Sequence, residues 1–278
     1  MATKEDVQAS KPVYTDVYWL TMKTIRVGLV QMHCEKGAIN DNLASIHAYL
    51  EEGMSQGVDI MCFPEMSITG YIDPTRYIEA ILHLNGPEVA RFVAMTKEIP
   101  ITAIAGFVEV NPQGKPFITQ IVAHSGKVLG VYRKKTIVDD EALWFAPGSS
   151  IVVFQHPKVA FGVTICADIN TPELFSENAR LGARIIFEAA APGLYGSQAT
   201  RDWQSGYRWW QQECHTKLGQ YAQDNSMYIA VATQAGRTID EDFPGGGYVF
   251  GPDGTCVYST LDWSEGVLYA TLLSREKG

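Results

Sequence analysis

Residues 160–168 read AFGVTICAD, an apolar strand pattern that runs directly into Cys166. Thr171, Pro172 and Glu173 follow, and a hydroxyl residue, a proline and an acid in this order are typical of a helix start. A thiol between a strand end and a helix N-terminus lies near the positive end of the helix dipole, which favours the nucleophilic thiolate. The pattern therefore indicates an activated nucleophile at Cys166, with a small buried apolar thiol as the alternative.

Two further strand patterns end in a charged residue. Residues 61–67 read MCFPEMS, so that Pro64 stops an apolar strand and Glu65 follows at once. Residues 130–135 read GVYRKK and place Lys134 just beyond another strand. Taken singly, a loop acid and a basic run are usually solvated surface groups. The position of each at a strand end makes it a candidate for a site at the rim of a sheet.

Together, the three strand ends would supply the parts of an acyl-transfer site. A thiol provides the nucleophile, a carboxylate a general base, and an amine a cation for the developing oxyanion, as a thioester mechanism requires. No G-x-S-x-G pattern occurs in the chain, so no serine nucleophile of that type competes. On the residues alone, chance coincidence stays an alternative, and Lys135 competes with Lys134 for the role of the cation.

The phrases at these positions are Phe63-Pro64-Glu65, Tyr132-Arg133-Lys134, and Ile165-Cys166-Ala167-Asp168 with Pro172-Glu173. In this order and spacing they resemble the Glu-Lys-Cys motifs of the nitrilase superfamily of carbon-nitrogen hydrolases. Flanking matches extend the resemblance over most of the chain from about Lys23: Gln31, Asn42-Leu43, Glu141 followed by Phe145-Ala146-Pro147-Gly148, Ala190-Ala191-Pro192, and residues 245–254.

The resemblance implies an α/β (α+β) fold, a four-layer αββα sandwich that pairs its helical faces in a homodimer or a higher homo-oligomer. It also implies that Cys166 is the nucleophile and Glu65 the general base. Lys134, which follows Tyr-Arg directly, would stabilise the tetrahedral intermediate with the backbone N–H of Ala167. Glu141 matches a second glutamate that orients the lysine and holds the substrate. No cofactor and no metal are required.

The function implied is a thiol-dependent hydrolase that cleaves a non-peptide carbon-nitrogen bond of a small amide. The reaction would run through a thioester acyl-enzyme and release ammonia or an amine. The resemblance suggests that nitrile-cleaving relatives extend further at the C-terminus, whereas this chain stops soon after its last strand pattern at Leu273, so an amidase is favoured over a nitrilase. An N-carbamoyl amino-acid amidohydrolase would need an arginine for the substrate carboxylate, and Arg180 or Arg201 could supply it. A catalytically silent binding module and a cysteine peroxidase are further alternatives.

The pocket wall is expected to differ from that of relatives. Ala167 is small where an aromatic or polar residue is common, Ser176 replaces a frequent arginine, and Thr136 a frequent histidine. Tyr71, Trp144 and Tyr195 lie near a motif in sequence and are the tentative substrate-binding residues, with ordinary core packing as the alternative. The aromatic stripe of residues 202–223 is more typical of packing or of a subunit interface.

Composition limits the classes of protein that fit. The 278 residues are 46% hydrophobic and carry 22 Lys+Arg against 31 Asp+Glu, a net charge of −9. This acidic balance argues against a nucleic-acid partner, and no apolar run is long enough for a membrane span. Five widely spaced cysteines and six histidines without ligand spacing suggest neither disulfides nor a metal site. We expect a cytoplasmic protein with an arm at residues 1–22 and one hydrolase domain at residues 23–278.

Strand and helix patterns alternate along that domain. Strands are expected at residues 25–30, 60–63, 101–110, 118–123, 127–132, 151–154, 159–165, 184–188, 227–232, 247–250, 256–258 and 267–272. Helices are expected after Asn40 as N-cap, with Leu43, Ile46, Leu50 and Met54 on one face, and at residues 86–98 and 202–223.

Overall fold

The computed structural model describes residues 23–138, 141–194 and 202–274. Within these residues the first sheet has the strand order β14-β1-β2-β3-β4-β5. Strands β1, β2 and β3 run parallel, and the remaining neighbours pair antiparallel. The bounds are β1 Lys23–Gln31, β2 Ile60–Cys62, β3 Thr102–Glu109, β4 Phe117–His124, β5 Lys127–Arg133 and β14 Gly266–Ser274.

The second sheet has the strand order β13-β12-β9-β8-β7-β6, and its central strands β7, β8 and β9 are parallel. Its bounds are β6 Phe154–His156, β7 Val159–Ile165, β8 Ile185–Ala190, β9 Tyr228–Thr233, β12 Tyr248–Phe250 and β13 Cys256–Ser259. A separate hairpin joins β10 (Ala235–Arg237) to β11 (Asp242–Pro244).

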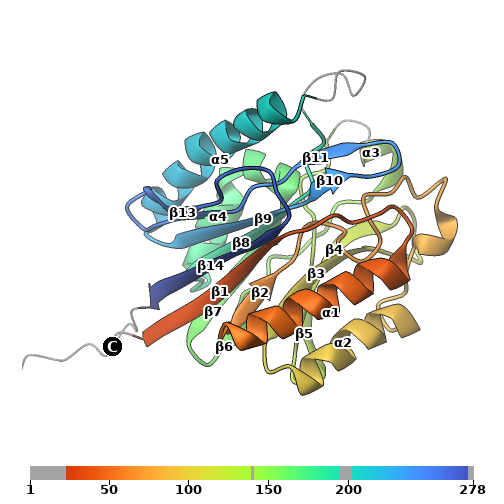
Figure 1. The fold of residues 1–278 in the computed structure, drawn as a ribbon, viewed down its shortest axis with the longest axis horizontal. Coiled ribbons are helices and arrows are strands. Elements are labelled where there is room, and N and C mark those ends of the chain that lie inside the picture. The colour runs from red at the N-terminus through yellow and green to blue at the C-terminus, as the bar shows by residue number, and fades with distance from the viewer. Residues whose placement is uncertain (1–22, 139–140, 195–201, 275–278) are drawn as a thin grey trace, which may run out of the picture.

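Helices cover the outer face of each sheet (Figure 1). The long helices are α1 Ile39–Ser55, α2 Pro87–Glu98, α4 Pro172–Arg180 and α5 Trp203–Asn225, and the short ones are η1 Ile78–Ala80, α3 Glu141–Trp144 and η2 Cys166–Asn170. Figure 1 shows α1 and α2 on one side and α4 and α5 on the other, with both sheets between them. The described residues therefore form the four-layer αββα sandwich that the resemblance implied.

Three apolar layers hold these sheets and helices together. Strand β8 shows the arrangement, because Ile185 and Phe187 pack in the core between the two sheets. The alternate residues Ile186 and Ala190 pack against α4 and α5. On the other side, Leu43 and Leu50 of α1 pack against the first sheet. Because both faces of the central strands are covered, β7 and β8 are mainly apolar on both faces. The buried polar exceptions Thr164 and Glu188 hydrogen-bond to each other.

The structure corrects several local expectations. Helix α1 begins at Ile39 after Ala38, and the side chain of Asn40 accepts a hydrogen bond from Arg91 instead of capping the helix. The expected cap Thr171 makes no side-chain cap bond, because its hydroxyl shares a hydrogen bond with Thr136. Strand β6 begins at Phe154, where the expected strand at residues 151–154 ends. Met54 is largely exposed rather than on the packed face of α1.

Candidate active site

The chain segments that follow β2, β5 and β7 bring Glu65, Lys134 and Cys166 into one site. The turn that carries Glu65 is fixed by side chains of the first sheet. The amide of Gln120 donates hydrogen bonds to the carbonyl oxygens of Phe63 and Pro64, at 3.4 and 3.2 Å. These two bonds fix the backbone just before Glu65, independently of the contacts that the Glu65 side chain makes.

Lys134 lies between two glutamates. Its Nζ atom is 2.9 Å from Oε1 of Glu65 and 2.6 Å from Oε1 of Glu141. The hydroxyl of Tyr71 donates to the same oxygen of Glu141 at 2.7 Å, and the backbone N–H of Ala191 donates to Oε2 of Glu65 at 3.0 Å. Glu65, Lys134 and Glu141 are buried, and Tyr71 lines a cavity beside them. Dissolved salt therefore screens the charges of these groups only weakly.

Cys166 lies at the point where β7 gives way to η2. Its φ angle is +46°, a left-handed conformation that is uncommon for any residue other than glycine. Within a short helix the first N–H groups lack an intrahelical acceptor, and Ala167 occupies such a position beside the thiol. Ala167 thus occupies a position where a backbone N–H can serve an oxygen bound next to Cys166, the role that the resemblance implied.

One carboxylate joins the nucleophile turn to the segment around Lys134. Oδ1 of the fully buried Asp168 accepts hydrogen bonds from the backbone N–H groups of Lys135 and Thr136, at 3.2 and 2.8 Å. Oδ2 accepts from the hydroxyl of Tyr132 at 2.8 Å and from the N–H of Ile165 at 3.0 Å. Asp168 appeared in the sequence motif without a role, and the structure gives it four donors.

Burial sets the protonation of the site. It raises the pKa of Glu65 to about 7, although Lys134 opposes the shift. Burial alone would lower the pKa of Lys134, yet the neighbouring Glu65, Cys166 and Glu141 raise it well above its ordinary value. Burial and Glu65 raise the pKa of the Cys166 thiol, with Lys134 acting in the opposite direction. The sequence predicted a thiolate favoured by a nearby helix start, but burial and Glu65 together favour the protonated thiol instead.

The structure separates the two adjacent lysines. Lys134 is buried among the carboxylates, whereas Nζ of Lys135 points to the surface and donates to the carbonyl oxygen of Ser149 at 3.1 Å. Neighbouring residues at the end of a strand point to opposite faces, which explains why one lysine reaches the site and the other does not.

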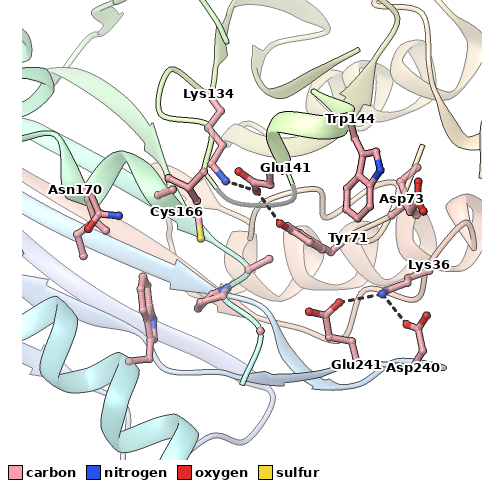
Figure 2. A pocket seen from close by; sticks show the side chains of 18 of the residues that line it. Lys36, Tyr71, Asp73, Lys134, Glu141, Trp144, Cys166, Asn170, Asp240 and Glu241 are labelled. Carbon is pink, nitrogen blue, oxygen red and sulfur yellow. Dashed lines mark hydrogen bonds and ion pairs between the residues drawn. The ribbon is translucent and has the colours of Figure 1, made fainter. Parts of the chain in front are cut away.

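A cavity of 570 Å³ opens in front of Cys166. Tyr71 and Trp144 line it as predicted (Figure 2), and Tyr195 lies outside the described residues. Trp210, in the aromatic stripe of α5, packs in the apolar core as expected. Trp210 and its neighbour Trp209 also line the cavity.

Sequence reasoning missed the far end of the cavity. Nζ of Lys36 lies 2.6 Å from Oδ1 of Asp240 and 2.9 Å from Oε2 of Glu241. The two acids lie in the turn between β10 and β11, about 200 residues from Lys36 in the chain. Such a distant pairing leaves no local pattern in the sequence, so no sequence signal could have found it.

Two kinds of feature are not found in the part of the chain that the structure describes. No group of three or more His, Cys, Asp or Glu residues is arranged to hold a metal ion there. No helix among the described residues combines the length and apolarity needed to cross a membrane.

The fold is that of a carbon-nitrogen hydrolase, and it brings the residues of the three sequence motifs into one site. A family model for carbon-nitrogen hydrolases matches residues 26–276, and the chain belongs to this family. The resemblance to the nitrilase superfamily noted from the sequence motifs is thereby confirmed.

Three known proteins illustrate the range of relatives. The N-carbamoylputrescine amidase of Arabidopsis thaliana is 26% identical over 89% of this chain and 86% of its own length. The glutamine-dependent NAD(+) synthetase of Acinetobacter baylyi is 25% identical over 90% of this chain, but the chain spans only 44% of that synthetase. The crystal structure of an amidase from Nesterenkonia sp. superimposes with a TM-score of 0.74 at 22% identity, covering 89% of this chain and 90% of the amidase.

Proposed function

We propose that this protein is a thiol-dependent hydrolase that cleaves the carbon-nitrogen bond of a small amide through a thioester. The observation that carries the proposal is the buried Lys134, which bridges Glu65 and Glu141 beside the thiol of Cys166. Amidases among the relatives, including an omega-amidase of Mus musculus that is 25% identical over 77% of this chain, support the same reaction class.

In the first step the sulfur of Cys166 attacks the amide carbon. Because burial raises the pKa of the thiol, the proton leaves during attack, and the neighbouring carboxylate of Glu65 receives it. The carbon-sulfur bond forms as the carbonyl π pair moves to oxygen. Lys134 and the N–H of Ala167 stabilise the oxyanion that results.

In the second step the carbon-nitrogen bond breaks. Glu65 returns its proton to the nitrogen, so that ammonia or an amine leaves and a thioester stays on Cys166. Glu65, again a carboxylate, then takes a proton from water, whose oxygen attacks the thioester. The carbon-sulfur bond breaks, the sulfur regains a proton from Glu65, and a carboxylic acid leaves.

Glu141 has a free oxygen for the substrate. Its Oε1 is occupied by Lys134 and Tyr71, whereas its buried Oε2 has no hydrogen-bond partner among the described residues. A buried acceptor without a donor is costly, and the N–H of a bound amide would relieve that cost. We therefore assign Glu141 to both lysine orientation and substrate binding, with Tyr71 and Trp144 as pocket walls and Tyr195 as a further candidate.

A nitrile or a carbamoyl substrate would use the same residues. The amide is favoured because the unpartnered Oε2 of Glu141 calls for a hydrogen-bond donor, which an amide nitrogen carries and a nitrile nitrogen does not. A carbamoyl compound also carries such a donor, so it stays the second candidate. The silent-module and peroxidase alternatives would leave the buried Lys134 and its two glutamates without use.

Assembly, location and domain extent complete the proposal. We propose one hydrolase domain at residues 23–278 preceded by an arm at residues 1–22, a homodimer or higher homo-oligomer, and a cytoplasmic location. The family match over residues 26–276 supports the domain limits. Light scattering on the purified full chain tests this assembly, and a monomeric mass at micromolar concentration would contradict it.

Ammonia release tests the reaction. The panel contains aliphatic and aromatic amides, ω-amides, carbamoyl amino acids and nitriles, and intact mass spectrometry of the protein detects the acyl-enzyme. We expect release that is lost in Cys166→Ala and retained in the control Cys256→Ala, whose partly exposed thiol lies on β13, away from the cavity. Turnover that persists in Cys166→Ala would overturn the nucleophile assignment. Undiminished turnover in Glu65→Gln would favour peroxidase-type chemistry.

A further inference from the structure

The cavity ends away from Cys166 in three carboxylates. Asp73, Asp240 and Glu241 line this part of its wall, which we call the acidic end (Figure 2). Asp73 lies on the loop after β2, and the other two acids lie in the turn between β10 and β11. Figure 2 shows Trp144 beside Asp73, on the side of the cavity where Tyr71 and Glu141 lie.

The two cations at the acidic end are already paired. Lys36, whose side chain is only 9% exposed, contacts Asp240 and Glu241 at 2.6 and 2.9 Å. Arg76 contacts Asp240 at 3.7 Å in a largely exposed pair. Among the described residues here, three carboxylates thus share two cations, and one negative charge is left over. A substrate carboxylate would have to displace an existing ion pair in order to bind.

Two further features of the same cavity point to a ligand that donates hydrogen bonds. Oε2 of Glu141, a side chain more than nine-tenths buried, has no partner among the described residues. Two aromatic side chains, Tyr71 and Trp144, line the cavity between Cys166 and the acidic end (Figure 2). Aromatic faces beside carboxylates are favourable surroundings for an organic ammonium group, because the ring quadrupole and the carboxylates both attract positive charge.

We infer that the preferred substrate is an amide that carries a positively charged amine, and this inference rests on the proposed function. The amide nitrogen donates to Oε2 of Glu141, and the ammonium group lies toward the acidic end beyond Trp144. The ammonium group pairs with the excess negative charge of the acidic end, and the contacts of Lys36 with Asp240 and Glu241 stay intact.

Three amides of matched length test the inference: 5-aminopentanamide, pentanamide and 4-carboxybutanamide, with shorter and longer ω-amino amides to find the best chain length. We expect kcat/KM to be about tenfold higher for the cationic amide than for the neutral one. The anionic amide should be the poorest substrate. The preference for the cation should shrink as salt is raised, because salt screens the charges at the open end of the cavity.

Variants of the acidic end locate the effect. In Glu241→Gln and in Asp73→Asn, the ratio of kcat/KM between the cationic and neutral amides should fall several-fold toward one. Two variants are used because Glu241 also pairs with Lys36, whereas Asp73 accepts from the neighbouring Thr75 in its own turn. The control is Glu177→Gln, which removes an acid that pairs with Arg180 on the exposed surface of α4, and it should keep the wild-type ratio.

The outcomes separate this inference from the proposed function. Ammonia release with equal or better use of the neutral or anionic amide would overturn the cationic substrate and leave the amidase in place. An unchanged ratio in both Glu241→Gln and Asp73→Asn would overturn the acidic end as its site. No release and no acyl-enzyme with any compound of either panel would overturn the amidase itself, and the substrate inference with it.

Discussion

The carboxylate of Asp168 accepts a hydrogen bond from the hydroxyl of Tyr132 at 2.8 Å, in the interior between the two sheets. Tyr132 lies two residues before Lys134, and Asp168 lies two residues after Cys166. The same carboxylate also binds the N–H groups of Lys135 and Ile165. The proposed cation and the proposed nucleophile are thus held at a fixed separation by a residue that contacts neither reacting group.

Asp168→Asn should lower kcat about 100-fold and change KM little, because a misplacement of roughly 1 Å costs that much in rate. The amide cannot accept from all four donors, so the turn at Cys166 shifts relative to Lys134. Tyr132→Phe removes a single donor and should lower kcat less. Steady-state kinetics on both variants, with urea unfolding as a control for stability, measure the effect. A loss of stability without a loss of kcat would show that Asp168 acts on the fold alone.

Much of this site could be predicted from the sequence. Each proposed catalytic group follows a strand pattern by a few residues, which marks it as a candidate for the rim of a sheet. Glu65 and Lys134 follow strands of the first sheet and Cys166 follows a strand of the second, so only the resemblance indicated that the three groups meet. The choice between Lys134 and Lys135 depended on resemblance, since the pattern at a strand end does not decide which lysine faces inward. The structure provides the reason, because one lysine is buried against Glu65 and the other donates to Ser149.

Other features had no local signal. The caps expected at Asn40 and Thr171 were reasonable on residue type, but tertiary partners took their side chains, Arg91 in one case and Thr136 in the other. The thiol was expected to be a thiolate because a helix start follows it. Burial next to Glu65 outweighs that effect, and burial cannot be read from neighbours in the sequence.

The rate should depend on pH through Glu65. The base must be a carboxylate to accept the thiol proton, and its pKa is raised by burial to about 7. As pH falls through 7 the carboxylate becomes protonated, so kcat/KM should decrease on the acid side with an apparent pKa near that value. A pH profile of kcat/KM from 5 to 9 measures it. A profile that is flat down to pH 5 would remove Glu65 from the role of base.

Glu141→Gln should reduce the rate more than the stability. The amide keeps an acceptor for Tyr71 and Lys134 but loses the charge that faces Lys134, so we expect kcat/KM to fall by about 100-fold or more. The free energy of unfolding should fall by about 1–2 kcal/mol, because the neutral amide still accepts from Tyr71 and Lys134 and only the charge of Glu141 is lost. Kinetics and urea unfolding on the same preparation compare the two. An unchanged rate would take Glu141 out of the site.

Gly106 on β3 tests how closely the first sheet supports Glu65. A Cβ atom at this position would lie 2.3 Å from the backbone nitrogen of Met66 and 2.9 Å from Oε1 of Gln120. Gly106→Ala must therefore push the turn that carries Glu65 away from β3. We expect a loss of about 1–3 kcal/mol in the free energy of unfolding, as for other overpacked sites.

The same substitution should also lower kcat about 100-fold, because Glu65 moves with its turn while the rest of the site stays in place. Gly114→Ala is the matched control, since its nearest neighbour to an added Cβ is 3.9 Å away and its φ angle is not positive. That variant should keep wild-type rate and stability within about 0.5 kcal/mol. If Gly106→Ala lost stability but kept its kcat, the turn after β2 would be able to move without carrying Glu65 out of reach of Cys166.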